Sequence, residues 1–415
     1  MMEYDLVIVG GGPAGLTAGI YGSRAKLKTA IIEKAALGGQ ASATREIANF
    51  PGFLENSGGP ELMKAMSDHA QRFGAEIIKD EVTKLELEGE RKNLWTKKGS
   101  RMTAKAVILA AGSQPRSLNI PGEKKFRGRG VSYCATCDAE FFENEQVVVV
   151  GSGDAALEEA VFIAKYASRV TVIVIHDEGH VDCNKVSAEK AFQNPSIEFL
   201  WHSVLTEIEG HEDVESVTIK NLKTNSTTRF KTNGVFIYVG GVPQTEFLKK
   251  QVAEDEAGYI LTNDLMETSL KGVYAAGDVR AKYLRQVITA ASDGAIAAVA
   301  AERYLAEEAD FQAQILNSPK PVLLFFWYPG DEQALKLLSL LEGIASELDD
   351  KIRLAKVDMS RKQGIAQKYN VQTAPAVLLL HKGEVCRELP SDPEQAGSPG
   401  YRQLLLKYLS VGEEG

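Results

Sequence analysis

A glycine-rich turn between an apolar strand and a helix occurs twice in this chain, and it restricts the local fold more than any other feature. In the first copy, the apolar run 4–9 leads into glycines at positions 10, 12 and 15. Gly10 permits a tight turn, Gly12 lets a pyrophosphate approach the backbone, and Gly15 allows close helix–strand packing. The next predicted strand ends at Glu33, whose carboxylate suits a ribose diol. The pattern predicts a dinucleotide-binding unit whose helix N-terminus faces the phosphates.

The second copy follows a predicted strand at 146–150 and has Gly151, Gly153 and Ala156 in its turn. A further strand is predicted at 169–175. Two such units in one chain are far more specific than one glycine-rich turn, which by itself is weak evidence. The chain is therefore predicted to be an α/β protein with two Rossmann-like nucleotide-binding domains.

A Cys-x-x-Cys pair, Cys134 and Cys137, precedes the second turn, and Asp138 follows it directly. Such a pair carries two electrons as a disulfide/dithiol couple, and its thiolate is the reactive form. The other two cysteines, Cys183 and Cys386, are solitary, so no second pair is available for a zinc site and no metal is expected. A dithiol between two nucleotide units predicts an electron-transfer enzyme.

Composition excludes several other classes. The net charge of −9 does not suggest a nucleic-acid partner, and no run of 18 apolar residues suggests a membrane span. The first residues lack the basic region of a signal peptide and lead directly into a strand. With only four cysteines, the chain is not a disulfide scaffold, and a cytoplasmic protein is expected.

The C-terminal part follows a different pattern, with predicted order βαβαββα, which is thioredoxin-like. Strands are expected at 321–327, 352–358, 376–381 and 384–388, and helices at 334–348, at 364–369 and from about 401.

Residues 1–310 resemble the low-molecular-weight, bacterial-type thioredoxin reductases. The matching motifs are Gly10-Gly-Gly-Pro-Ala-Gly15, Gly38-Gly-Gln40, Asn49-Phe-Pro-Gly52, Ala110-Ala-Gly112, Ser132-Tyr-Cys-Ala-Thr-Cys-Asp138, Gly151-Ser-Gly-Asp154, Ala275-Ala-Gly-Asp278 and Arg285-Gln286. The resemblance implies a flavin domain at 1–116 and 244–310 and a dithiol domain with an NAD(P)-type fold at 117–243. The change of pattern after residue 310 predicts a linker at 311–320 and a thioredoxin-like domain at 321–415. It also implies a homodimer whose dithiol domain rotates, alternately presenting the dithiol to the flavin and to a thioredoxin-type protein substrate.

The resemblance further implies the cofactor FAD and the residues that hold it. These are Gly10, Gly12, Pro13, Ala14, Gly15, Glu33, Gly39, Gln40, Asn49, Ala111, Gly112, Gly277, Asp278, Arg285 and Gln286. By the same resemblance, Cys137 faces the flavin, Cys134 exchanges with the substrate disulfide, and Asp138 transfers the proton.

The sequence departs from the family where the electron donor would bind. Members that use NADPH have a His-Arg-Arg-x-x-x-Arg motif after the strand that follows the second turn. In the ungapped register, Ile175, His176 and His180 replace these arginines, and a shift of two residues places acidic residues there. Either register disfavours NADPH, and Val174 at the strand end does not clearly support NADH. Gly151, Gly153, Ala156, His176 and His180 therefore form a possible degenerate dinucleotide site.

Loss of the nicotinamide donor resembles the pyridine-nucleotide-independent branch, which takes electrons from reduced ferredoxin. Ferredoxin is thus the expected donor, and it would need a basic patch such as Lys124, Lys125, Arg127 and Arg129. Three alternatives stay open: an NADH-dependent disulfide reductase, a flavin dithiol oxidase that uses oxygen, and a non-catalytic flavin redox sensor.

The thioredoxin-like part departs from its family as well. Asp331 and Ala334 occupy the positions of the two redox cysteines, and Phe325 occupies that of the buried acid. Pro375 remains and is expected to be cis by resemblance. This domain cannot exchange dithiols with its own residues, which leaves docking, dimerisation, mimicry of the substrate or no function.

Overall fold

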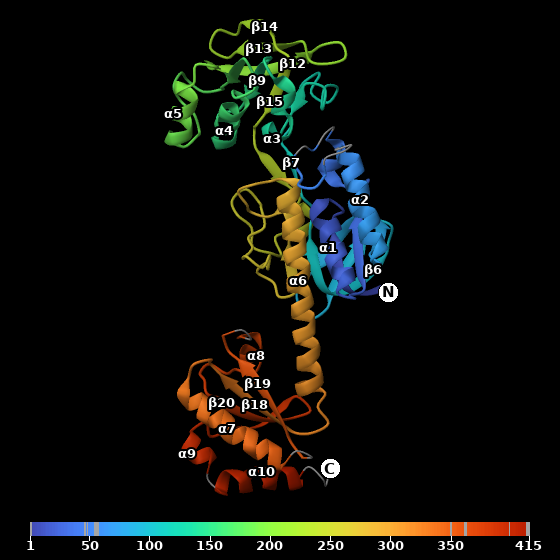
Figure 1. Ribbon diagram of the computed structural model, residues 1–415, viewed down its shortest axis with the longest axis vertical. Helices are drawn as coiled ribbons and strands as arrows, with labels where there is room; N and C mark the ends of the chain where they lie inside the picture. The colour runs from blue at the N-terminus through green and yellow to red at the C-terminus, as the bar shows by residue number, and fades with distance from the viewer. Residues whose placement is uncertain are drawn as a thin grey trace. The chain divides into compact units, whose positions relative to one another are not determined.

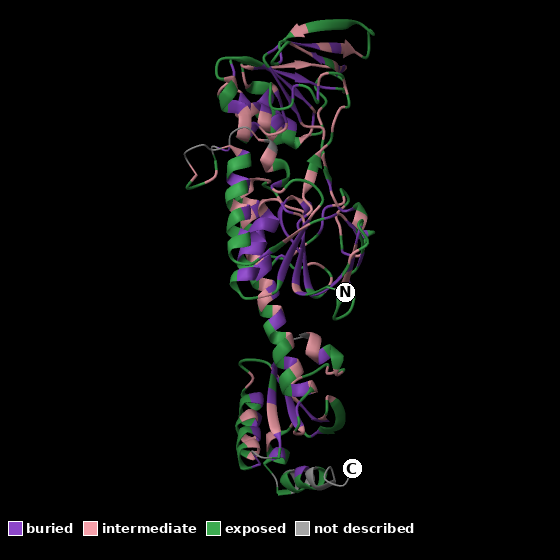
Figure 2. Ribbon diagram, turned by 90° about the vertical axis from the view of Figure 1, so that its right-hand side faces the viewer, coloured by how far each residue is buried: buried purple, intermediate pink, exposed green. Residues whose placement is uncertain are grey.

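The computed structural model describes residues 2–44, 47, 49–53, 58–348, 351–360, 363–397 and 399–411. These residues form two compact units, Met1–Arg303 and Tyr304–Gly415, and each is considered by itself (Figure 1). In both units the buried residues concentrate in the sheets and on the inner faces of their helices (Figure 2).

The flavin domain is built on a seven-stranded sheet with the order β3-β2-β1-β6-β5-β4, and β17 also pairs with β6. Its strands are β1 Met2–Val9, β2 Thr29–Glu33, β3 Glu76–Lys79, β4 Val82–Glu86, β5 Lys92–Thr96, β6 Arg101–Leu109 and β17 Val273–Ala275. The helices are α1 Pro13–Arg24, α2 Gly59–Arg72 and α6 Val287–Phe311, with short turns η1 Gly39–Ala43, η3 Glu246–Leu248 and η4 Gly277–Val279. β1 pairs in parallel with β2 and β6, so its apolar residues are buried on both faces and the glycine-rich turn leaves from the sheet centre.

The dithiol domain repeats this arrangement in a five-stranded sheet with the order β11-β10-β9-β15-β8. Its strands are β8 Val131–Ser132, β9 Gln146–Val150, β10 Arg169–Ile173, β11 Ile197–Leu200 and β15 Gly234–Ile237, and its helices are α3 Ala135–Asp138, η2 Ala139–Phe142, α4 Asp154–Ile163 and α5 Lys185–Gln193. A second sheet contains β12 Ser203–Glu209, β13 Ser216–Asn221 and β14 Thr227–Lys231. The chain passes between the two domains along the antiparallel pair β7 Ser113–Pro115 and β16 Gly241–Pro243.

The C-terminal unit has a four-stranded sheet with the order β19-β18-β20-β21. Its elements are β18 Val322–Trp327, α7 Glu332–Glu347, β19 Arg353–Asp358, α8 Gln363–Lys368, β20 Ala376–His381, β21 Glu384–Leu389, α9 Pro393–Ala396 and α10 Pro399–Val411. Phe325 is fully buried in the core of this unit, where an apolar ring fits better than an unpaired acid. The Ala374–Pro375 bond is cis, as the resemblance implied.

The expected α/β class, the two nucleotide-type folds and the thioredoxin-like fold are all confirmed. Three details differ from the sequence-based expectation. β10 ends at Ile173 rather than at 175, and α9 is an additional helical turn. In the stretch 311–320, α6 continues to Phe311 and the π-helix η5 follows at Gln312–Leu316. Among the described residues, none of the helices is both long enough and apolar enough to cross a membrane.

Candidate functional site

The first glycine-rich turn is shaped by two close backbone approaches. A β-carbon on Gly10 would lie 2.2 Å from the carbonyl oxygen of Ala110, and one on Gly15 would lie 1.8 Å from that of Gly10. Gly12 is different, because a β-carbon there would meet nothing within 4 Å. The backbone at Gly12, the N-cap of α1, therefore faces free space at a helix N-terminus, where a phosphate group fits.

Glu33 lies at the end of β2 and turns back toward this glycine-rich turn. Its carboxylate accepts hydrogen bonds from the backbone N–H groups of Gly11 at 2.7 Å and Ala35 at 2.9 Å. A carboxylate fixed beside the turn in this way is the group that accepts hydrogen bonds from a ribose diol in dinucleotide-binding folds.

A buried cluster of charges supports the backbone at Gly277, which lies against Ala14 of the first glycine-rich turn and with it forms the cradle for the cofactor. Sequence reasoning missed this cluster. Asp293 on α6 accepts hydrogen bonds from Gly277 N at 3.0 Å, Arg280 Nη1 at 3.1 Å and Lys282 Nζ at 2.8 Å. The Asp293 side chain is only 9% exposed, so the two cations compensate for its burial. The cluster thus fixes the backbone of Gly277 through the helix that follows it.

Among the buried polar atoms of the flavin domain that have no hydrogen-bond partner among the described residues are Oδ1 of Asp278 and Nε of Arg285. Burial raises the pKa of Asp278, and the nearby Lys282 opposes this rise. Unsatisfied buried polar groups are costly, so both atoms suit a hydroxylated or phosphorylated ligand. Together with the open Gly12 and with Glu33, they fit the ribityl, pyrophosphate and adenosine parts of FAD.

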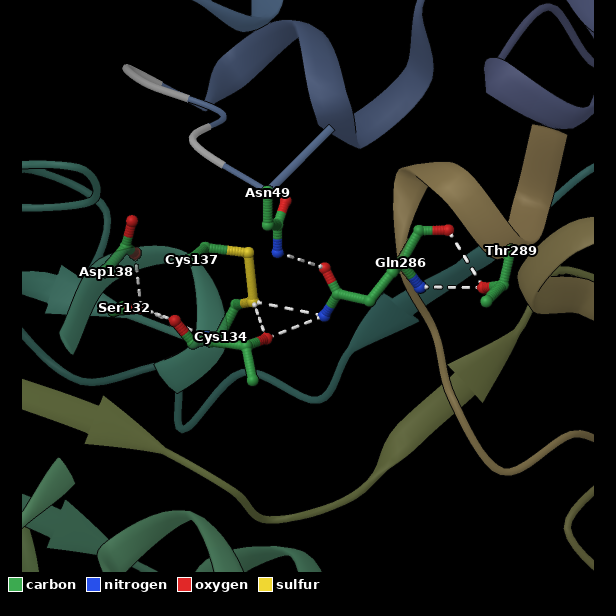
Figure 3. The surroundings of a disulfide bond; sticks show 8 residues. Asn49, Ser132, Cys134, Cys137, Asp138, Gln286 and Thr289 are labelled. Carbon is green, nitrogen blue, oxygen red and sulfur yellow. Dashed lines mark hydrogen bonds between the residues drawn. A yellow bond between two sulfur atoms is a disulfide. The ribbon is translucent and has the colours of Figure 1, made fainter. Parts of the chain in front are cut away.

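The dithiol is closed as a Cys134–Cys137 disulfide at the start of α3, with the two Cα atoms 5.3 Å apart. It lies against the predicted FAD residue Gln286, as Figure 3 shows. Gln286 Nε2 donates to Thr136 Oγ1 at 2.7 Å and contacts Cys134 Sγ at 3.8 Å, while Gln286 Oε1 accepts from Asn49 Nδ2 at 3.1 Å. Residues from both predicted domains therefore meet at the disulfide.

Ser132 holds the carboxylate of Asp138 beside the cysteines. The Ser132 hydroxyl donates to Asp138 Oδ2 at 2.5 Å and accepts from the backbone N–H of Cys134 at 3.0 Å (Figure 3). Burial raises the pKa of Asp138, and the hydrogen bond from Ser132 partly opposes the rise. Asp138 thus retains a proton to higher pH than an exposed aspartic acid does, as a proton donor near the dithiol requires.

A second contact joins the two domains through Gln40. Arg127 Nη2 donates to Gln40 Oε1 at 3.2 Å, and its guanidinium lies 5.2 Å from the centre of the Tyr133 ring. The Tyr133 hydroxyl donates to the buried Glu123 at 2.6 Å. Burial and this bond to Glu123 raise the pKa of Tyr133, so its hydroxyl remains a donor at neutral pH.

The second glycine-rich turn repeats the first with a constant offset of 141 residues. Gly10 N donates to Ile32 O at 2.8 Å, and Gly151 N donates to Ile173 O at 3.3 Å. The residue after Ile173 is Val174, so a buried valine occupies the position that Glu33 has in the first turn.

A carboxylate reaches the second turn from farther along the chain. The Ser152 hydroxyl donates to Asp182 Oδ2 at 2.9 Å, and His176 Nε2 lies 2.7 Å from the same oxygen. The bond to His176 lowers the pKa of Asp182 most, followed by the bond from Ser152. His180 Nε2 is 4.0 Å from Asp182 Oδ1, beyond hydrogen-bond distance.

The structure places the remaining predicted residues around the same cradle. Pro13 and Ala14 begin α1, and Gly277 lies against Ala14, where a β-carbon would approach within 2.9 Å of the Ala14 Cβ. Gly39 lies beside Gly12, and Ala111 and Gly112 follow β6. Cys183 is half-buried and Cys386 is exposed on β21, each without a second cysteine. Sequence reasoning assigned no role in the site to Ser132, Thr136 or Asp293, and it considered Asp182 only as an acid that disfavours a phosphate. Of these four residues, only Ser132 and Thr136 lay in a matched motif.

Comparison with known proteins identifies the family. The model of the pyridine nucleotide-disulphide oxidoreductase family matches residues 4–294, and the thioredoxin model matches residues 303–396. The chain is 47% identical to a thioredoxin reductase of Peptoclostridium acidaminophilum over 74% of its own length and 98% of the relative. It is also 34% identical to a bifunctional thioredoxin reductase/thioredoxin of Mycobacterium leprae, over 98% of this chain and 96% of that protein.

Solved structures give the same answer. The thioredoxin reductase of Streptococcus pyogenes is 43% identical and has a TM-score of 0.69, covering 74% of this chain and 99% of that one. That of Giardia duodenalis is 37% identical with a TM-score of 0.69, over 74% of this chain and all of that one, 100%. The chain therefore belongs to the FAD-binding thioredoxin reductases of bacterial type, within the pyridine nucleotide-disulphide oxidoreductase family, and it has an additional C-terminal thioredoxin domain.

Proposed function

We propose that this protein reduces the disulfide of a separate thioredoxin-type protein, using electrons that pass from FAD to the Cys134–Cys137 pair. The observation that carries the proposal is the position of this disulfide against Gln286, the residue expected beside the flavin. FAD, when bound, supplies two-electron transfer to the disulfide, and the residues of the chain do the rest.

The exchange on the protein side balances with two electrons and two protons. In the reduced enzyme, the Cys134 thiolate attacks the substrate disulfide, forms a mixed disulfide and releases one substrate thiolate. The Cys137 thiolate then attacks Cys134 Sγ, which releases the second substrate thiolate and restores the Cys134–Cys137 disulfide. Asp138, whose pKa is raised by its burial and whose carboxyl group is oriented by Ser132, donates a proton to a departing thiolate.

The C-terminal domain does not supply the substrate disulfide. Asp331 and Ala334 stand at the start of α7, where a thioredoxin has its two cysteines, and the single cysteine of this domain, Cys386, is on β21. The Mycobacterium leprae relative is named for both a reductase and a thioredoxin. In this chain the corresponding domain retains the fold but has no dithiol, so the substrate must be a different molecule.

The donor is proposed to be a pyridine nucleotide, and the expectation of ferredoxin is not supported. The family model is that of pyridine nucleotide-disulphide oxidoreductases, and the curated relatives named above are thioredoxin reductases without mention of ferredoxin. Two members of the basic patch suggested for ferredoxin docking already have partners: Arg127 binds Gln40, and Lys125 Nζ donates to Gly210 O at 3.2 Å. The homodimer and the cytoplasmic location remain predictions.

A trapping experiment tests the proposed exchange. The Cys137→Ser variant should accumulate a mixed disulfide between Cys134 and a thioredoxin, because the enzyme no longer has the Cys137 thiol that displaces the reduced substrate. The Cys134→Ser variant is the matched control and should accumulate none. Non-reducing electrophoresis with mass mapping measures the mixed disulfide in both variants. Catalytic reduction of a thioredoxin disulfide by the wild type would exclude the alternative of a non-catalytic redox sensor. Stoichiometric oxygen consumption coupled to oxidation of reduced thioredoxin would instead indicate a dithiol oxidase.

A further inference from the structure

The second glycine-rich turn has the backbone features of a working dinucleotide site. A β-carbon on Gly151 would lie 2.3 Å from Tyr238 O, as one on Gly10 would lie 2.2 Å from Ala110 O. Gly153, like Gly12, is the N-cap of the following helix and would have nothing within 4 Å of an added β-carbon. The phosphate-binding backbone is therefore retained in the dithiol domain, although the arginines expected of an NADPH site are absent.

Asp182 supplies at this turn what Glu33 supplies at the first. In the first unit, the second residue of the turn, Gly11, donates its backbone N–H to Glu33. In the second unit, the corresponding residue, Ser152, donates its hydroxyl to Asp182. Both carboxylates thus lie beside the same residue of the turn, although Asp182 comes from the loop after β10 and Glu33 from the end of β2 itself.

The geometry leaves Asp182 able to bind a ligand. Its Oδ2 accepts the bonds from Ser152 and His176, whereas the nearest partner of its Oδ1 among the described residues is His180 at 4.0 Å. The Asp182 side chain is 57% exposed, so a ligand can reach it. A carboxylate fixed on one oxygen and free on the other suits the hydroxyls of a ribose and repels a 2′-phosphate.

The surrounding charges point the same way. Residues 174–184 contain Asp177, Glu178 and Asp182 but neither arginine nor lysine. Asp154 at the start of α4 adds a further carboxylate and accepts from Asn184 N at 2.7 Å. A 2′-phosphate would therefore meet several like charges, with no arginine or lysine in the loop to neutralise it.

Two further atoms are suited to a polar ligand at this edge of the sheet. Oε2 of Glu159 on α4 is buried without a hydrogen-bond partner among the described residues, and the buried hydroxyl of Tyr238, which follows β15, lies near it. In open α/β sheets, ligands bind outside the carboxyl ends of the strands, which is where β15 and the turn before α4 meet.

We propose that the electron donor is NADH rather than NADPH, and that Asp182, held by Ser152 and His176, is the residue that selects it by accepting the adenosine ribose hydroxyls. This rests on the proposed function and specifies its donor. The overall reaction balances as NADH, a proton and a thioredoxin disulfide giving NAD⁺ and a thioredoxin dithiol.

Binding of the oxidised nucleotides tests the proposal without any turnover of thioredoxin. Calorimetry on the oxidised, FAD-loaded protein should give an affinity for NAD⁺ at least about tenfold higher than for NADP⁺. Asp182→Asn should weaken NAD⁺ binding by about tenfold and reduce the preference, because asparagine retains the size of the side chain but loses its charge. Anaerobic bleaching of the flavin by NADH or NADPH gives the kinetic counterpart, with the change expected in KM rather than in kcat.

Asp177→Asn is the matched control in the same loop. The carboxylate of Asp177 lies 3.1 Å from His202 Nδ1, is 90% exposed and makes no bond to the turn among the described residues, so this variant should bind NAD⁺ as the wild type does. Tighter binding of NADP⁺ than of NAD⁺ by the wild type, or equal losses of NAD⁺ binding in the two variants, would overturn the assignment. Bleaching by reduced ferredoxin but by neither nucleotide would also overturn it, while leaving the thioredoxin-reducing step intact.

Discussion

The side-chain amide of Gln286 donates a 2.7 Å hydrogen bond to Thr136, across 150 residues of sequence. This bond holds the segment between the two cysteines against the flavin domain. Because a thioredoxin must reach the same cysteines, the bond has to break in every catalytic cycle that the resemblance implies. In the rotation that the resemblance implies, the strength of this bond is one of the contributions to the balance between the two orientations of the dithiol domain.

Thr136→Val should loosen this contact. Valine keeps the shape of threonine but cannot accept the bond, and one such bond contributes about 1 kcal/mol, which is roughly a fivefold change in an opening equilibrium. We expect an added small dithiol to reduce the Cys134–Cys137 disulfide of the oxidised protein roughly fivefold faster than in the wild type. Thr136→Ser keeps the hydroxyl and should behave as the wild type does; equal rates in all three proteins would show that the bond does not restrain the dithiol.

The pH dependence of turnover should report Asp138. Burial raises its pKa, so the protonated, donating form persists above the usual range of a carboxyl group and is lost as the pH rises through the raised value. Asp138→Asn should remove this limb of the kcat profile and lower kcat by about 10²-fold.

Ser132→Ala should move the decrease of kcat with pH to higher pH rather than abolish it. The Ser132 hydroxyl donates to the carboxylate and so stabilises the charged form, which means that its loss raises the pKa of Asp138 further. A profile that moves to lower pH in this variant, or does not move, would contradict the assigned roles.

The backbone of the site was predictable from the sequence, whereas its side-chain supports were not. A tight turn that leaves no room for a β-carbon at Gly10 or Gly151 must be glycine whatever lies elsewhere, so the sequence shows it directly. Asp182 contacts Ser152 only because the loop after β10 returns to the turn, and loop length does not determine that path. The buried strands were equally clear from their apolar runs, while the small helix α9 carried no periodic signal.

Asp293 shows the same limit inside a helix. It lies within an alanine-rich stretch of α6, where a single aspartate normally indicates an exposed position, yet it is buried by contacts with Arg280 and Lys282. Asp293 has a structural role only because α6 packs where its carboxylate can bind Gly277 N and the two cations. The prediction of ferredoxin as the donor is not supported, because it was inferred from the absence of the arginine motif. The absence of that motif does not show which residues bind the donor instead.

Substitution of Asp293 should release FAD and destabilise the first unit. Asp293→Leu removes the ion-pair partner of the buried Arg280 and Lys282 and leaves Gly277 N without its acceptor, which costs about 3–5 kcal/mol. Asp293→Asn retains an acceptor for Gly277 and should lose less. Urea unfolding and the flavin absorbance retained after gel filtration measure the two effects, and the exposed Asp264→Asn is the control. Equal FAD retention in all three variants would show that the Asp293 cluster does not contribute to FAD binding.

The last prediction concerns the start of α7 in the C-terminal unit, where Asp331 is a helix cap instead of a redox cysteine. A thioredoxin carries a cysteine at this position, whereas here the side chain of Asp331 caps the helix by accepting from Gln333 N at 2.9 Å and Ala334 N at 3.2 Å. Asp331→Ala should therefore cost about 1 kcal/mol in local stability, and Asp331→Asn, which is as good a cap, should cost little. Hydrogen exchange of the first amides of α7 in the full chain measures the difference, and unchanged protection in the alanine variant would contradict the capping role. Because the cap needs the oxygen that a thiol lacks, returning cysteine to this position should lower protection as alanine does.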